Sequence, residues 1–251
     1  MLSMLAKHKE IYFKKIITIA CVLFFLLVAV FFIQTLSKSI GNIFFGGVPK
    51  LYNLTFAKFF YSLAGSPIVG IPQPFVFHQL SRTYFIQGKY EQALYFARKE
   101  MEMYPENRAT LYIEGLTLGY MGREREAIIV FAKYIEFNPK SWAARNDKAW
   151  LEFRIGEIDE AVITIEPVSG MVGNPWVQNT YGTLLMNKLR YDEAAVAFFN
   201  AKIAISKINE YSWGSAYPGN DPRVYVSGLQ SMRTSIEKNI ELNLARRTAG
   251  Q

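Results

Sequence analysis

A short pattern recurs along the chain at a period close to 34 residues. It ends each time in an alanine, and these alanines, Ala93, Ala127, Ala161 and Ala194, are 34, 34 and 33 residues apart. A fixed period in this range is typical of stacked helical hairpins, because one hairpin cannot bury its apolar face alone. We therefore expect an all-α chain in which helical hairpins stack into a solenoid.

Each unit of the pattern indicates two helices joined by a tight turn. In the first unit, residues 75–87 and 90–104 are the expected helices, and Gly88 stands between them, where a residue that tolerates positive φ ends a helix. Small residues also recur in the first helix of each unit, at Ser81, Gly115, Ala149 and Gly182. Small side chains allow paired helices to approach closely. A coiled coil would need an unbroken heptad pattern, which the recurrent Gly, Pro and Asn interrupt.

The pattern resembles the tetratricopeptide repeat (TPR). The second unit fits best, with the family's characteristic residues at Gly115, Gly122, Ala127, Phe131 and Pro139. The third unit departs most, because Pro167, Ser169 and Gly170 interrupt its second helix. The resemblance implies a right-handed α-solenoid over residues 74–209, with units 74–107, 108–141, 142–174 and 175–208. It also implies that the array binds other protein chains.

Residues 16–33 are uncharged, and Thr18 is the only polar side chain among them. At 1.5 Å per residue they span roughly 27 Å, close to the thickness of a hydrocarbon core. Their fourteen Leu, Ile, Val and Phe residues, at about −0.3 to −0.6 kcal/mol each, favour insertion by roughly 4 to 8 kcal/mol. We expect a signal anchor at residues 16–35, in contact with the lipid bilayer. A cleaved signal peptide and a lipoprotein modified at Cys21 are the alternatives, but the apolar run is too long and continues past the cysteine.

Basic residues flank this run unevenly. Lys7, Lys9, Lys14 and Lys15 precede it, whereas only Lys38 and Lys50 follow closely. The positive-inside rule then puts the N-terminus, residues 1–15, in the cytoplasm and the array outside it. The net charge of +7 is also concentrated here, since residues 1–73 contribute +6 and residues 74–209 are balanced. A balanced array offers no basic stripe for phosphates, so we expect no nucleic-acid binding.

The segments on either side of the array are less regular. Residues 36–73 are apolar and interrupted by glycines and prolines, with one expected helix at 51–63. This lead-in either packs on the first repeat or lies in the membrane interface. Residues 210–251 contain a turn-rich break at 217–222 and a last helix at 224–244, expected to cap the array. A partner-binding tail is the alternative.

The sequence does not indicate catalysis. It has two histidines, His8 and His78, and one cysteine, and it lacks the phosphate-loop, dinucleotide-binding, hydrolase and zinc-protease motifs. The acidic pairs at Asp159 and Asp192 begin expected helices, where carboxylates suit the helix dipole. We therefore expect no catalytic residue, no metal site and no small-molecule cofactor.

In the TPR family the first helix of each unit lines a concave groove, so the resemblance also implies a binding site. The matching positions hold His78, Arg82, Tyr112, Tyr120, Asn146, Trp150, Arg154, Trp176, Asn179 and Asn187. Amides can bond to a peptide backbone, and Tyr, Trp and Arg are frequent anchors of interfaces. Phe85 and Phe153 share such positions but alternatively pack in the core. The family's clamp for carboxyl termini uses Lys and Asn where His78 and Arg82 stand, so that ligand class is not expected.

These features together predict a single-pass, membrane-anchored scaffold or adaptor that binds a protein or peptide in its groove for an envelope assembly. Two alternatives remain open. The chain is either a constitutive structural subunit of a membrane complex, held through its lead-in and back face, or a non-catalytic accessory of an envelope enzyme.

Overall fold

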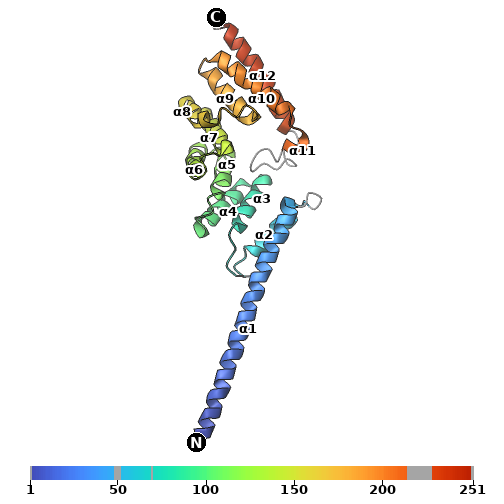
Figure 1. Ribbon diagram of the computed structural model, residues 1–251, viewed down its shortest axis with the longest axis vertical. Coiled ribbons are helices and arrows are strands. Elements are labelled where there is room, and N and C mark those ends of the chain that lie inside the picture. Colours follow the sequence, from blue (N-terminus) through green and yellow to red (C-terminus); the bar gives the residue numbers. More distant parts are fainter. Residues whose placement is uncertain (1, 48–51, 69, 214–227, 250–251) are drawn as a thin grey trace. The chain divides into compact units, whose positions relative to one another are not determined.

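The computed structural model describes residues 2–47, 52–68, 70–213 and 228–249, without the side chains of residues 2–12, 47 and 211. Every element in these ranges is helical (Figure 1), so the all-α expectation is confirmed. The chain divides into two compact units, residues 1–83 and 84–251, which are described separately.

The first unit is dominated by the long helix α1, Leu2–Asn42. Its apolar side chains, such as Phe25 and Leu27, are exposed all round. Among the described residues, one helical segment, Phe13–Gly46, is long and apolar enough to cross a membrane. The helix continues beyond the expected end of the anchor at residue 35, because no helix breaker occurs there. A short π-helical turn, η1 (Ile43–Gly47), follows and contains Gly46 at φ 154°.

A second helix, α2 (Leu54–Ala64), follows in the first unit. It begins at Leu54 because the Asn53 side chain caps it, accepting hydrogen bonds from the backbone N–H groups of Thr55 and Phe56. Tyr61 packs against Gly41 of α1, where an added Cβ would lie 2.6 Å from the ring. The Tyr61 hydroxyl also donates to Asn42 Oδ1 at 2.7 Å. The lead-in therefore packs on the end of α1.

The lead-in also meets the start of α3 (Val76–Ile86), the first helix of the first repeat. A Cβ added at Gly65 would lie 3.0 Å from the Phe77 ring and 3.2 Å from Val76 Cγ1. The α3 residues 76–83 belong to the first unit, and residues 84–86 to the second. Packing on the first repeat, one of the two interpretations left open, is thus part of the structure of the first unit.

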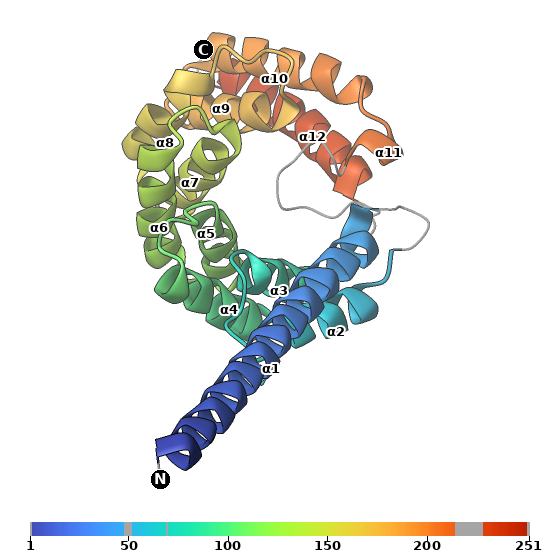
Figure 2. The same ribbon diagram turned by 60° about the horizontal axis from the view of Figure 1, so that its bottom comes forward.

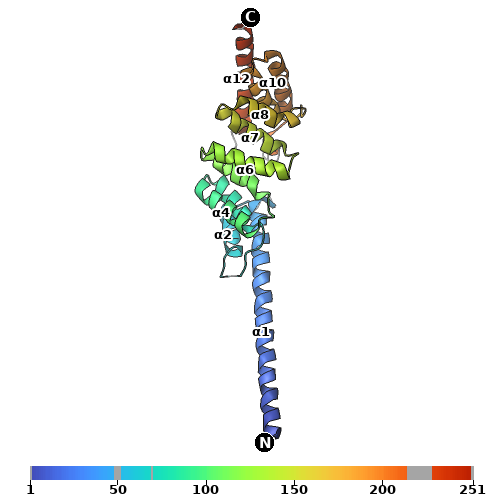
Figure 3. The same ribbon diagram turned by 90° about the vertical axis from the view of Figure 1, so that its left-hand side faces the viewer.

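The second unit is a succession of antiparallel helix pairs. Its elements are α4 (Tyr90–Met103), α5 (Thr110–Tyr120), α6 (Glu124–Phe137), α7 (Trp142–Arg154), α8 (Ile158–Ile165), η3 (Glu166–Val168), α9 (Pro175–Asn187), α10 (Tyr191–Ser206), α11 (Glu210–Trp213) and α12 (Gly228–Ala249). Figure 2 shows α5, α7 and α9 along the inner side, with α6, α8 and α10 outside them. Figure 3 shows the outer helices stacked in chain order. This arrangement is the expected solenoid.

The turn between the helices of each repeat has the same backbone conformation in all four copies. Gly88, Gly122 and Gly156 have φ of 69°, 73° and 85°, and Leu189 has φ of 60°. This is the left-handed region, which costs a residue with a Cβ about 1–2 kcal/mol. The fourth repeat therefore keeps the turn of the others although its sequence departs from the pattern.

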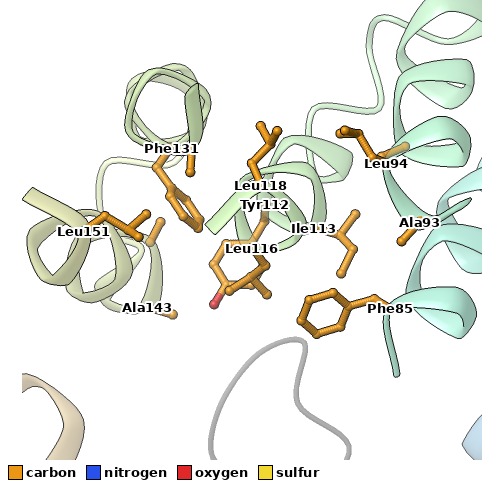
Figure 4. Packing of buried hydrophobic residues seen from close by; sticks show 13 residues of the cluster. Phe85, Ala93, Leu94, Tyr112, Ile113, Leu116, Leu118, Phe131, Ala143 and Leu151 are labelled. Carbon is orange, nitrogen blue, oxygen red and sulfur yellow. The ribbon is translucent and has the colours of Figure 1, made fainter. Parts of the chain in front are cut away.

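Close approach of paired helices builds the core. A Cβ added at Gly115 would lie 3.0 Å from the ring of Phe131, and one at Gly182 would lie 2.7 Å from Phe198. Both phenylalanines and the four repeated alanines are fully buried. Figure 4 shows Phe131 among its neighbours in this cluster, which include Tyr112 and Leu151. The small residues singled out in the sequence are thus the points where the helices meet.

The ends of the second unit follow from local sequence. In the third repeat α8 stops at Ile165 and a 3-10 turn containing Pro167 follows, as the sequence predicted. The expected break at 217–222 and the first residues of the expected last helix, 224–227, lie outside the described residues. Helix α12 buries Leu229 and Ile236 in a cluster with Ile205 and Trp213. It closes the apolar end of α10, which is the capping role expected for it.

Candidate partner-binding cleft

A cleft of about 700 Å³ opens in the second unit between α5, α7, α9 and α12. The expected groove residues that line it are Tyr120, Asn146, Trp150, Arg154, Trp176 and Asn179. Their helices are the first helices of repeats two to four. The repeat geometry therefore brings these side chains together from three consecutive units.

Two aromatic side chains in the cleft are open to solvent. Tyr120 is 51% exposed and Trp150 is 42% exposed. Trp150 packs on Phe153 with ring centres 5.4 Å apart, and Tyr120 meets Phe85 edge-on at 5.1 Å. Phe85 is buried in the core, which is one of the two positions that the sequence left open for it. Each exposed ring therefore packs against a second aromatic ring.

The charged residues of the cleft are held by neighbouring repeats. Arg154 Nη2 donates to Glu124 Oε1 of α6 at 2.8 Å. Asp147 Oδ2 accepts a 2.8 Å hydrogen bond from the Tyr112 hydroxyl of α5. Asp147 was not among the expected site residues, although it lies three residues before Trp150 and so shares its helix face. That spacing was the signal that could have found it.

Tyr112, in contrast, does not line the cleft. It is buried, and its ring packs on Phe131 at 5.7 Å and on Tyr134 at 5.5 Å. Its hydroxyl reaches Asp147, so it positions that carboxylate from within the core. Tyr112 is therefore a core residue, although it occupies a groove position of the repeat pattern.

Trp176 lies at the edge of the cleft within a stack of three tryptophans. Its ring centre is 5.9 Å from that of Trp142 and 5.1 Å from that of Trp213. Trp142 and Trp176 are 34 residues apart, so one ring comes from each of two successive repeats. Trp176 therefore joins the third repeat, the fourth repeat and α11, and presents only part of its surface to the cleft.

Several solved structures share this architecture. A crystal structure of MamA protein matches with a TM-score of 0.58 at 19% sequence identity, covering 70% of this chain and 93% of that one. A structure described as MamA MSR-1 matches with a TM-score of 0.56 at 16% identity, covering 69% and 97%. YrrB, described as a TPR protein with an unusual peptide-binding site, matches with a TM-score of 0.55 at 18% identity, covering 67% and 84%. The fold is that of a TPR array. No family model and no curated protein sequence matches the chain.

The last repeat of the TPR array is engaged by the chain's own C-terminal helix. Asn239 Nδ2 of α12 donates to Asn179 Oδ1 at 3.0 Å, and Arg246 Nη1 donates to Asn187 Oδ1 at 3.5 Å. Asn187 does not line the cleft, whereas Met232 of α12 does. The contribution of α12 was not expected from the sequence, because nothing in the local pattern links residues about 60 positions apart.

The expected groove residues of the first repeat, His78 and Arg82, belong to the first unit. His78 meets the Phe75 ring edge-on at 5.9 Å, and the Arg82 guanidinium lies 4.6 Å above the centre of the Phe45 ring. Burial, with a smaller contribution from the Arg82 charge, lowers the pKa of His78 to about 4. Arg82 therefore packs on the lead-in, whereas His78 packs on Phe75 within its own repeat and is neutral at pH 7.

The outer helices of the TPR array carry a second regular feature, which we call the outer stripe. It consists of Tyr95, Ile129, Ile163 and Val196, which are 59%, 56%, 69% and 62% exposed. Each follows a repeat alanine by two residues, so the stripe has the same spacing as the alanines. The stripe was not expected from the sequence, although the 34-residue period is a signal that could have predicted it.

Proposed function

We propose that the protein is a membrane-anchored scaffold whose TPR array binds a segment of a partner protein in the cleft. One observation carries the proposal: Tyr120 and Trp150 are exposed beside Arg154 in a cleft of about 700 Å³, and each packs against a second aromatic ring. Exposed Trp, Tyr and Arg in a concave site are the residues that most often dominate binding energy. The peptide-binding site named for YrrB supports the same use of the fold.

The cleft favours an extended segment with an apolar side chain. Tyr120 and Trp150 offer exposed apolar surface, while Leu116, Asn146 and Thr180 form buried parts of the cleft wall. An apolar anchor of the bound segment would pack against Trp150. Asp147 and Arg154, each already paired inside the array, would give the segment its orientation.

We further propose that α1 spans a membrane with the array on the non-cytoplasmic side, where it serves an envelope assembly. The support is the exposed apolar helix and the excess of lysines before it. A cysteine at the exposed position Lys140, in a Cys21→Ala background, tests the orientation in intact cells. Labelling by a membrane-impermeant maleimide is expected. Labelling only after the cells are broken would reverse the orientation.

Site-specific photo-crosslinking in native membranes tests the binding proposal. Probes replace Tyr120 and Trp150, and the control probe replaces Glu136, an exposed polar residue of the outer helix α6. We expect a discrete crosslinked band from both cleft positions and none from Glu136. If neither cleft position gives a crosslinked band while the protein is intact in the membrane, the cleft is excluded as the binding surface.

The outer stripe favours a second candidate function, that of a constitutive structural subunit. Large exposed apolar patches often mark protein contacts, and the outer stripe repeats an exposed apolar residue on four successive outer helices. A probe at Ile129 separates the two functions in the same experiment. A band from Ile129 alone would favour the structural subunit, and bands from Tyr120 and Trp150 alone would favour the adaptor.

A further inference from the structure

The segment that links α2 to α3 turns back along α1. We call its described residues, 66–68 and 70–74, the return segment. Gly70 lies against Val30, since an added Cβ would be 2.8 Å from Val30 Cγ1. Further along, Gln73 Nε2 donates to Thr35 Oγ1 at 2.5 Å, and Lys38 Nζ donates to the Pro74 carbonyl at 2.8 Å. Figure 1 shows this segment beside α1, below α2.

These contacts fix how far the return segment reaches along the apolar helix. Val30 lies three residues inside the end of the apolar run at Ile33, which is about 5 Å along a helix. Elements that lie in a membrane interface bury their apolar side about 5–10 Å deep. If α1 spans a membrane, Gly70 is therefore level with the edge of the hydrocarbon core.

The side chains of the return segment have the distribution that such a position requires. Its inner side covers the polar Gln34 of α1, which is only 3% exposed. Its large apolar side chains Ile68 and Ile71 are 93% and 80% exposed. In water this arrangement would bury an amide and expose two isoleucines, whereas in lipid it shields the amide and immerses the isoleucines.

The charge of the surrounding chain favours lipid over a protein as the occupant. No Asp or Glu occurs between Glu10 and Glu91, while Lys38 and Lys58 lie beside the return segment and on α2. A stretch with basic and no acidic residues suits a lipid surface, because lysine can pair with headgroup phosphates and no carboxylate is there to repel them. We propose that the return segment inserts into the bilayer beside α1, as a second membrane contact.

This inference rests on the proposal that α1 spans a membrane, and one experiment separates the two. The full chain, in a Cys21→Ala background, is reconstituted into liposomes of phosphatidylcholine and phosphatidylglycerol. An environment-sensitive fluorophore is attached to a single cysteine at Ile68 or Ile71. Leu26, in the middle of the apolar run, serves as the control position expected in lipid. Lys140, on the array, serves as the control position expected in water.

We expect fluorophores at positions 68 and 71 to be quenched by lipids brominated near the headgroup and protected from aqueous iodide. Position 26 should respond to lipids brominated deep in the chain, and position 140 to iodide alone. If positions 68 and 71 behave like 140 while 26 stays in lipid, the second membrane contact is overturned and the anchor stands. If position 26 is also open to iodide, both proposals fail. Because the liposomes contain no other protein, quenching by brominated lipid identifies lipid as the occupant.

Discussion

Leu189 shows how a single residue can depart from a repeat pattern without changing the structure. It occupies the left-handed turn position that glycine holds in the other three repeats, and its side chain is exposed. Because it makes no buried contact, its conformational cost is not offset by burial. The cost must instead be met by the packing of α9 on α10, which fixes the turn from both sides.

Leu189→Gly is therefore expected to stabilise the array. Relief of the left-handed strain is worth about 1–2 kcal/mol, and the greater freedom of glycine in the unfolded chain offsets roughly half of it. We expect a net gain of about 0.5–1 kcal/mol in the free energy of unfolding, measured by urea denaturation. Gly122→Leu is the matched reverse change and should destabilise by a similar amount. No gain from Leu189→Gly would mean that its strain is relieved by contacts of the leucine side chain.

His78 provides a prediction of pH dependence at the residue scale. Its folded pKa of about 4 lies below the usual 6.5, so the unfolded chain binds more protons between these values. Stability should therefore be greatest above pH 6.5 and fall as the pH drops from 6.5 toward 4. Imidazole NMR signals of the full chain, assigned with a His78→Gln variant, measure the pKa directly. A His78 signal that titrates near 6.5 would contradict the burial that causes the shift.

At the scale of helices, stability depends on how closely the two helices of each pair approach. The closest approach described in the array is at Gly182 of α9 beneath the buried ring of Phe198 in α10. A side chain at Gly182 would push the ring out of its place, because the surrounding core is fully buried. The small residues recur in the sequence because there is no space for a larger side chain where the two helices of a pair meet.

Gly182→Ala should destabilise the array by about 1–3 kcal/mol, as expected for overpacking of a core. Thermal unfolding followed by circular dichroism measures the loss. Gly173→Ala is the matched control, since a Cβ at Gly173 meets nothing within 4 Å. Phe198→Leu in the Gly182→Ala background should recover part of the loss. Equal melting temperatures for Gly182→Ala and Gly173→Ala would rule out the steric explanation.

The capping role of α12 makes a further prediction about elements. Ile236 is fully buried in the cluster that closes the array, whereas Leu244 of the same helix is 59% exposed. Ile236→Ala should cost about 2–5 kcal/mol, and Leu244→Ala no more than about 0.5 kcal/mol. Urea denaturation of both variants measures the difference. Similar costs for the two would show that α12 is not packed as a cap.

At the scale of the whole chain, the sequence was sufficient for features that depend on local repetition. The period predicted the helix pairs, and the uncharged run predicted the helix that can span a membrane. Helix ends agree closely, as for α4, which was expected at 90–104 and is Tyr90–Met103. Such features were predictable because capping, glycine turns and apolar periodicity act between residues that are near in sequence.

The features that could not be predicted join residues far apart in sequence. Asn239 bonds to Asn179, sixty residues earlier, and Gln73 bonds to Thr35, 38 residues earlier. Neither contact is part of the repeat, so no period records it. Tyr112 is a different case, since the repeat gave its position but not the depth at which Phe131 and Tyr134 enclose it. Of the expected site, the inner positions Asn146, Trp150 and Arg154 of α7 all line the cleft, whereas Asn187 of α9 does not.

The stack of Trp142, Trp176 and Trp213 has a consequence for how this protein can be observed. All four tryptophans of the chain lie within residues 142–213, so tryptophan emission originates from the array and not from α1. The Trp176 ring lies between those of Trp142 and Trp213, whereas Trp150 packs on Phe153 and has its ring open to the cleft. Intrinsic tryptophan fluorescence therefore reports on two regions of the protein. Trp142, Trp176 and Trp213 report whether the last repeats are folded, and Trp150 reports whether a ligand occupies the cleft.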